Sequence, residues 1–385
     1  MSRFISFRIP VLLVCLAGVV NASAVERWRF IITCDTRNNT ASGINDQIVH
    51  ELTGEILRAN VDFVIIAGDL VNGVRAGASH FETQLWNWVA ALKPIYDARI
   101  PVYVCRGNHE LGDMWDAEPG DPPPLDNYAK RWLNVFGSGS YPQQKLPDNG
   151  PSDERYMSYS VAHKNALIVA LDQYAGIEHQ LAHTVNQSWL DAQLTANARP
   201  HVFVFGHEPA FRALHADCLD SDPRQRDAFW HSLRAAGARM YLCGHDHFYD
   251  HARIDDGDGK ADNDLHQYIV GTGGASFYYW TPPYDGNNGD FYVAQVYHAE
   301  SYGYVLVEID DLKVTTTWME RQSSYLSQPG VYKAKDVWTY TAGCKVKLAA
   351  DLNGDCRVDF ADLAILASEW LASGNPPSPA VNSQR

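Results

Sequence analysis

Short apolar segments alternate with helical patterns along most of the chain, and this alternation limits the possible fold more than any other feature. The helical patterns cover residues 45–58 and 81–92. The apolar segments are apolar on both faces, as are strands buried inside a parallel sheet. They are residues 30–32, 63–66, 102–104, 166–171, 202–205 and 240–242. This order of elements predicts an α/β domain with a largely parallel sheet.

Strands become more frequent in the second half of this region. Residues 156–162 and 166–171 have the pattern of a hairpin that turns at His163-Lys164-Asn165. Further strands are expected at 267–270 and 305–309. Because a hairpin pairs its strands antiparallel, we expect mixed sheets.

Composition and charge exclude some classes of protein. Apolar residues make up 46% of the 385 residues, which is enough for a large core, so extended disorder is excluded. The formal net charge of −15 argues against nucleic acid as a routine partner, because phosphate backbones bind clustered Lys and Arg. An acidic chain favours cation binding and fits an extracellular protein.

Residues 1–24 have the pattern of a secretory signal peptide. Arg3 and Arg8 accompany an apolar stretch at 11–20, and Ala22-Ser23-Ala24 is a small-residue cleavage signature. An uncleaved anchor is the alternative, although the stretch is shorter than the ~20 residues of a membrane span. We therefore expect an exported protein, whether secreted, periplasmic or at the cell surface, with no transmembrane span.

Five polar motifs follow predicted strands, where open α/β sheets place their functional sites. Each supplies a carboxylate, amide or imidazole that can bind zinc, iron or manganese. In the last motif, two His residues two positions apart project in the same direction from a strand end. The joint occurrence predicts a metal site. The motifs are Asp35-Thr36-Arg37, Gly68-Asp69, Gly107-Asn108-His109-Glu110, Gly206-His207 and Gly244-His245-Asp246-His247.

These motifs resemble those of the calcineurin-like metallophosphoesterase superfamily, specifically its branch similar to purple acid phosphatases, over residues 28–318. The resemblance implies a sandwich of two mixed β-sheets flanked by helices, and two divalent or transition metal ions (Zn, Fe or Mn) that turn water into a hydroxide. It also implies that His109 lies beside the substrate and protonates the leaving oxygen. The implied metal ligands are the shared Asp69, with Asp35 and His247 in the first site and Asn108, His207 and His245 in the second.

The first motif departs from the family pattern. The family usually has Asp-x-His there, or a Tyr where this chain has Asn72, but this sequence has Arg37. Arginine keeps its proton and is not a realistic metal ligand, so the first site lacks one nitrogen donor. Arg37 either binds a substrate phosphate or pairs with a nearby carboxylate. Both alternatives are open from the sequence.

A second motif lies near the C-terminus. Oxygen ligands occur with the spacing of a calcium-binding loop, and the helix that follows carries Phe360, Leu363, Leu366 and Trp370 on one face. The segment resembles one repeat of a type I dockerin, which implies bound calcium and a cohesin-like or cell-surface partner. A Cys344–Cys356 disulfide would suit so small a module. The expected calcium ligands are Asp351, Asn353, Asp355, Arg357 (through its carbonyl), Asp359 and Asp362.

Together these features predict a signal peptide at 1–24, a phosphoesterase domain at 25–319, a linker at 320–343, a dockerin-like repeat at 344–375 and a disordered tail at 376–385. The expected function is secreted, metal-dependent hydrolysis of phosphate esters. The alternative is a non-catalytic, metal-stabilised binding protein attached to the cell surface through the dockerin-like repeat.

Overall fold

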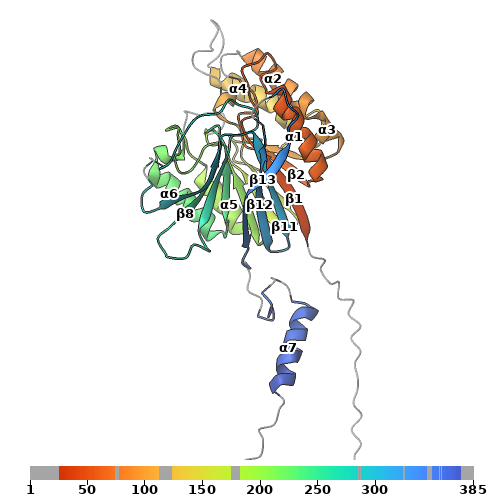
Figure 1. Cartoon of the computed structure of the whole chain (residues 1–385), viewed down its shortest axis with the longest axis vertical. Helices are drawn as coiled ribbons and strands as arrows, with labels where there is room; N and C mark the ends of the chain where they lie inside the picture. Colours follow the sequence, from red (N-terminus) through yellow and green to blue (C-terminus); the bar gives the residue numbers. More distant parts are fainter. Residues whose placement is uncertain are drawn as a thin grey trace, which may run out of the picture. The chain divides into compact units, whose positions relative to one another are not determined.

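The computed structural model describes residues 26–73, 78–111, 124–174, 183–284, 286, 288–323, 326–344, 349–354, 356 and 358–373. The chain contains a large compact unit, residues 26–346, and a C-terminal unit that begins at residue 347 (Figure 1). The predicted signal peptide and the tail at 376–385 lie outside the described residues.

The first sheet of the large unit has the strand order β13-β12-β11-β1-β2-β3. β1, β2 and β3 run parallel, and β11, β12 and β13 continue the sheet antiparallel from β1. The sheet is therefore mixed. Its strands are β1 (Arg27–Thr33), β2 (Phe63–Ile66), β3 (Val102–Val104), β11 (Gly303–Asp310), β12 (Lys313–Arg321) and β13 (Tyr332–Thr341).

The second sheet has the order β10-β8-β9-β7-β6-β5-β4. Its centre, β5, β6, β7 and β9, is parallel, and both margins are antiparallel. The predicted hairpin is β4 and β5, which pair from Tyr159↔Ala170 to His163↔Ala166. The strands are β4 (Tyr159–His163), β5 (Ala166–Ala170), β6 (His201–Phe205), β7 (Met240–Cys243), β8 (Tyr249–Asp255), β9 (Leu265–Val270) and β10 (Tyr292–Ala299).

Helices connect the parallel strands, as the alternating pattern predicts. The first begins after Asn45, whose side chain accepts a hydrogen bond from the backbone NH of Ile48, and ends at Asn60 in the left-handed conformation. In Figure 1, α1 to α4 (red to yellow) group together, apart from α5 and α6 (green). The helices are α1 (Asp46–Ala59), α2 (Ala78–Ala91), α3 (Lys93–Asp97), α4 (Pro124–Trp132), α5 (Gln187–Ala196) and α6 (Pro223–Ala235), with shorter turns η1 (Asn108–Glu110), η3 (Leu133–Gly137) and η4 (Leu219–Ser221).

Aromatic side chains join the two sheets. Phe30 of β1 meets Phe203 of β6 edge-on, with ring centroids 5.1 Å apart. Tyr249 of β8 stacks on Trp318 of β12 at 4.1 Å. Because large buried rings contribute much of a core's stability, these contacts fix one sheet against the other. The fold is thus the predicted sandwich of two mixed sheets with flanking helices.

The predicted linker at 320–343 is wrong. Residues 332–341 form β13, which pairs antiparallel with β12, so the large unit extends past the expected boundary at residue 319. The sequence does not indicate this strand because polar residues interrupt the apolar pattern from which the other strands are predicted. Asp336 is buried and accepts hydrogen bonds from Tyr249 and His251, whereas Lys333 and Lys335 face solvent at the edge of the sheet.

The C-terminal unit contains α7 (Phe360–Ser373), preceded by a turn-rich segment. Phe360, Leu363 and Leu366 are exposed. Cys344 and Cys356 are both disulfide-bonded, in agreement with the predicted bridge, whereas Cys34, Cys105, Cys218 and Cys243 are buried free thiols. Among the described residues, no helix is long and apolar enough to cross a membrane.

Candidate metal centre

The candidate ligands lie just beyond the carboxyl ends of parallel strands in both sheets. Asp35, Asp69 and Asn108 follow β1, β2 and β3, and His207 and His245 follow β6 and β7. Backbone hydrogen bonds join the neighbouring turns, from Asp35 NH to the Gly68 carbonyl and from Gly244 NH to the His207 carbonyl. The predicted ligands therefore converge on one region between the sheet ends, although they come from distant parts of the sequence.

Three of these turns hold a non-glycine residue in the left-handed backbone conformation. The φ angles of Asp35, Asp69 and His245 are 57°, 50° and 71°. This conformation costs about 1–2 kcal/mol per residue and is tolerated where the surroundings enforce it, commonly at functional sites. Gly107 shows how tightly the turns pack, because a Cβ added there would lie 2.2 Å from Asp69 Oδ1.

Glu110 holds the turn that carries Asp69. Its buried carboxylate accepts hydrogen bonds from the backbone NH groups of Asp69, Leu70, Val71 and Gly107, at 2.7 to 3.3 Å. The turns after β2 and β3 are thus joined by one side chain. Glu110 belongs to a motif that the sequence identifies, but its role acts through backbone groups, which a side-chain pattern does not show.

One group of candidate ligands surrounds the Asn108 amide. Asn108 Oδ1 lies 3.1 Å from His207 Nε2 and 3.1 Å from His245 Nδ1. His207 Nδ1 donates to the Ala67 carbonyl at 2.9 Å, so Nε2 presents a lone pair to Asn108 and, at 3.4 Å, to Asp69 Oδ1. The Asn108 oxygen and the two imidazole nitrogens are atoms of the kind that bind zinc or manganese, so this group can hold a cation.

A second group contains Asp35, Asp69 and His247, whose ligand atoms lie within 4.8 Å of one another. His247 Nδ1 donates to the Ser276 carbonyl at 2.8 Å, which leaves the Nε2 lone pair facing Asp35 Oδ1 at 3.4 Å. Asp35 is fully buried, and its Oδ1 has no hydrogen-bond partner. An orphaned buried carboxylate oxygen beside an imidazole lone pair fits a metal ion at this position.

The electrostatics of this region keep Asp69 ionised. Burial alone would raise the pKa of Asp69, but the nearby His109, His207 and Arg37 outweigh burial and lower it. The pKa of Asp35 is also lowered, because His247 and His207 outweigh its burial. Both carboxyl groups are therefore available as charged ligands, and Asp69 faces both groups of residues.

Arg37 pairs with the carboxylate of a candidate ligand, which is the second of the two alternatives that the sequence leaves open. Its Nε donates to Asp69 Oδ2 at 2.9 Å, and one terminal nitrogen donates to His247 Nε2 at 3.2 Å. Tyr278 is a third neighbour, since its ring stacks on His247 at 4.2 Å. The guanidinium therefore lies among the atoms that would bind the first metal.

Comparison with known proteins agrees with this geometry. A family model for calcineurin-like phosphoesterases matches residues 42–249, more than half of the chain. The chain belongs to the calcineurin-like phosphoesterase family. No curated protein sequence matches this phosphoesterase significantly.

Solved structures share the fold of this phosphoesterase at low sequence identity. A purple acid phosphatase from yellow lupin aligns with a TM-score of 0.57 and 16% identity over 82% of this chain, but the chain spans only 54% of that enzyme. A PhoD structure aligns at 0.54 and 11% identity, covering 83% of this chain and 70% of that one. A Plasmodium protein described as the anchor in the inner membrane complex aligns at 0.50 and 16%, covering 88% and 95%.

His109 of the phosphoesterase lies next to Asp69; its expected place beside a substrate stays a prediction. Its Nδ1 donates to the Asn72 carbonyl at 2.5 Å, and its Nε2 lies 3.9 Å from Asp69 Oδ2. Nε2 is therefore the atom that can exchange a proton with a bound substrate. Burial lowers the pKa of His109.

Several polar residues of the phosphoesterase surround the ligands and were not predicted. Asp217 Oδ1 lies 3.5 Å from His245 Nε2. Burial alone would raise the pKa of Asp217, but His245 outweighs burial and lowers it to about 2. His215 donates to the buried Asp246 and packs its ring against His245. They lie in the irregular segment after β6, where the sequence has neither a strand pattern nor a motif to indicate them.

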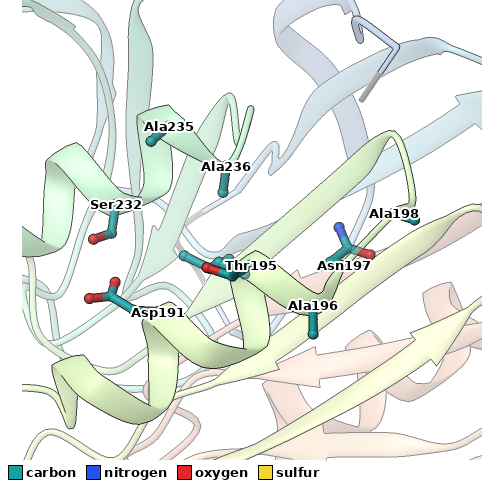
Figure 2. Close-up of a pocket in the computed structure, with 9 residues that line it drawn as sticks. Asp191, Thr195, Ala196, Asn197, Ala198, Ser232, Ala235 and Ala236 are labelled. Atoms are coloured by element: carbon teal, nitrogen blue, oxygen red, sulfur yellow. The ribbon is translucent and has the colours of Figure 1, made fainter. Parts of the chain in front are cut away.

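A pocket of about 680 Å³ lies between the ends of α5 and α6, on a different part of the phosphoesterase (Figure 2). Asp191 and Thr195 of α5 line it together with Ser232 of α6 and several alanines. None of the predicted metal ligands is among its lining residues, so the pocket is separate from the candidate metal centre.

Proposed function

We propose that this chain hydrolyses phosphate esters at a dinuclear metal centre formed by Asp35, Asp69, Asn108, His207, His245 and His247. The observation that supports this most strongly is the convergence of lone pairs from both sheets onto one region, with Asp35 Oδ1 buried and without a hydrogen bond. Such an arrangement is unstable without a cation, and the family of the chain uses metals for ester hydrolysis.

The residues around the centre have separate roles. Asp69 faces both groups of ligands and would be shared between two ions, which would lower the pKa of bound water and so supply the nucleophile. His109 presents Nε2 to the leaving oxygen and would donate a proton there from its doubly protonated form, because Nδ1 keeps its own hydrogen bonded to the Asn72 carbonyl. Arg37 adds a fixed positive charge that can attract the phosphate.

The proposal is tested with purified protein stripped of metal by a chelator and then reconstituted separately with Zn²⁺, Mn²⁺ and Fe²⁺. Hydrolysis is measured on panels of phosphate monoesters and diesters. We expect activity only after reconstitution, and the two panels together identify the preferred ester class. Hydrolysis that persists in the stripped protein, or none with any metal or ester, would refute the proposal.

We also propose that the protein is exported and that its C-terminal unit binds calcium and a cohesin-like or cell-surface partner. In the described part of the loop, Asp351 accepts backbone hydrogen bonds from Gly354 and Cys356, and Asp362 accepts them from Leu352 and Asn353. Such bonds orient the acidic side chains of a calcium loop. Two further expected ligands, Asp355 and Arg357, lie outside the described residues. Calcium-dependent protection of this unit from proteolysis tests the proposal, and equal cleavage with calcium or chelator opposes it.

The contacts of Arg37 also support the second candidate function, a non-catalytic binding protein. A guanidinium bonded to Asp69 and His247 neutralises part of the site without any metal. In that case the protein would remain folded and bind its surface partner with no hydrolysis under any metal condition. The reconstitution assay described above separates the two functions.

A further inference from the structure

The contacts of Arg37 are with the same atoms that would hold the first metal. Its guanidinium donates to Asp69 Oδ2 and His247 Nε2, at 2.9 and 3.2 Å. His247 Nε2 has a single lone pair, because Nδ1 donates its hydrogen to the Ser276 carbonyl. That lone pair can accept a hydrogen bond from Arg37 or bind a metal, but it cannot do both.

Arg37 cannot remove this conflict by losing its proton. A guanidinium remains charged at any ordinary pH. The side chain is also mostly enclosed, with 16% of its surface exposed. A metal at the first position must therefore displace Arg37.

The second group of ligands is not affected in the same way. Among the described contacts, none joins Arg37 to Asn108, His207 or His245. A divalent ion there can bind while Arg37 keeps both of its present partners. An ion at the first position instead has to compete with the guanidinium for Asp69 Oδ2 and His247 Nε2.

We infer that the two metal positions are unequal. One ion resides with Asp69, Asn108, His207 and His245, while Arg37 occupies the first position until a phosphate group draws the guanidinium away. A phosphate offers two oxygens to the planar guanidinium and so replaces both of its present partners. The first position, Asp35 with His247, then becomes available. This inference rests on the proposed function, since it assigns Arg37 a place in the same centre.

Metal binding to the full-length protein tests this inference directly. Stripped protein is titrated with Mn²⁺ by calorimetry, and bound manganese is measured after dialysis, with and without inorganic phosphate. The wild type should bind one ion tightly and a second at least about tenfold more weakly, and phosphate should strengthen the second. Arg37→Ala should bind two ions of similar affinity without phosphate.

Matched variants locate each ion. His207→Ala should remove the tight ion, and Asp35→Asn should remove only the weak one. Arg131→Ala is the control, since Arg131 pairs with Glu82 outside the centre, and its titration should match the wild type. Equal affinities for the two ions in the wild type, or unchanged affinities in Arg37→Ala, would overturn the inference. If the protein hydrolyses esters but binds its two ions with equal affinity, this inference is wrong and the proposed function stands. If the two affinities differ but no ester is hydrolysed, the proposed function is wrong and this inference stands.

Discussion

Glu110 Oε2 accepts a hydrogen bond of 2.9 Å from the backbone NH of Asp69, so a carboxylate from one motif fixes the candidate shared ligand of another. The same carboxylate binds the NH groups of Gly107, Leu70 and Val71. The position of Asp69 thus depends on a buried side chain with no predicted metal role. This relationship yields the first prediction.

Glu110→Gln should weaken both folding and metal binding. Glutamine keeps one acceptor oxygen but turns an NH₂ group toward buried backbone NH groups, and each such unsatisfied donor costs about 1–3 kcal/mol. Denaturant unfolding should show a loss of about 2 kcal/mol or more in the free energy of unfolding. Glu82→Gln, at a pair nearer the surface, should change it by less than about 1 kcal/mol. Equal effects of the two substitutions would contradict the assigned role of Glu110.

His109→Ala should leave the metal content unchanged and reduce kcat by ~10²–10⁴-fold, the usual contribution of a general acid. Esters with very acidic leaving groups need no proton, so kcat for these esters should fall much less. The measurement is kcat across a series of aryl phosphates of increasing leaving-group pKa. A uniform loss across the series would argue against proton donation by His109.

His266 should make the large unit less stable in acid. Burial and the neighbouring His251 lower the pKa of His266 from 6.5 to about 2. Between these values the unfolded chain binds a proton that the folded protein does not. Stability is therefore complete above pH 6.5 and falls below it by up to about 1.4 kcal/mol per pH unit.

His266→Phe should flatten this dependence between pH 7 and pH 5 in denaturant unfolding, even if stability at pH 7 is lower. The control is His231→Phe on α6, whose ring packs against Phe291 away from His266. An acid slope unchanged in His266→Phe would show that other groups cause it.

Two truncations should have opposite results. Removing residues 347–385, with Cys344→Ser to avoid a free thiol, should leave folding and hydrolysis intact, because the large unit is complete without them. Removing 331–385 also deletes β13, with Trp338 stacked on His266 at 3.9 Å and Asp336 bonded to His251. That protein should unfold at a much lower denaturant concentration. A folded and active shorter protein would mean that β13 is dispensable.

Much of the candidate centre could be predicted from the sequence because strand ends fix where side chains meet. Asp35, Asp69 and Asn108 each follow a buried apolar strand, and parallel strands bring their carboxyl ends to the same edge of a sheet. The positions of the ligands therefore follow from local patterns, although His207 and His245, the partners of Asn108, lie 99 and 137 residues away from it.

Features that depend on contacts between distant side chains could not be predicted in the same way. The pairing of Arg37 with His247 joins residues 210 positions apart, and the sequence alone leaves its partner open. Likewise, Asp336 makes β13 resemble a linker in the sequence. In the structure Asp336 is buried and accepts hydrogen bonds from Tyr249 and His251. Polar strand positions are informative only once their partners are known.

The central claim is that metals held through Asp69 support ester hydrolysis, and Asp69→Asn tests it most directly. The substitution keeps the size of the side chain but removes the negative charge that both groups of ligands share. Bound metal and phosphate-ester hydrolysis are measured on the same reconstituted preparation, after circular dichroism confirms folding. We expect lower metal content and no detectable hydrolysis. A folded Asp69→Asn protein with full metal content and full activity would contradict the account.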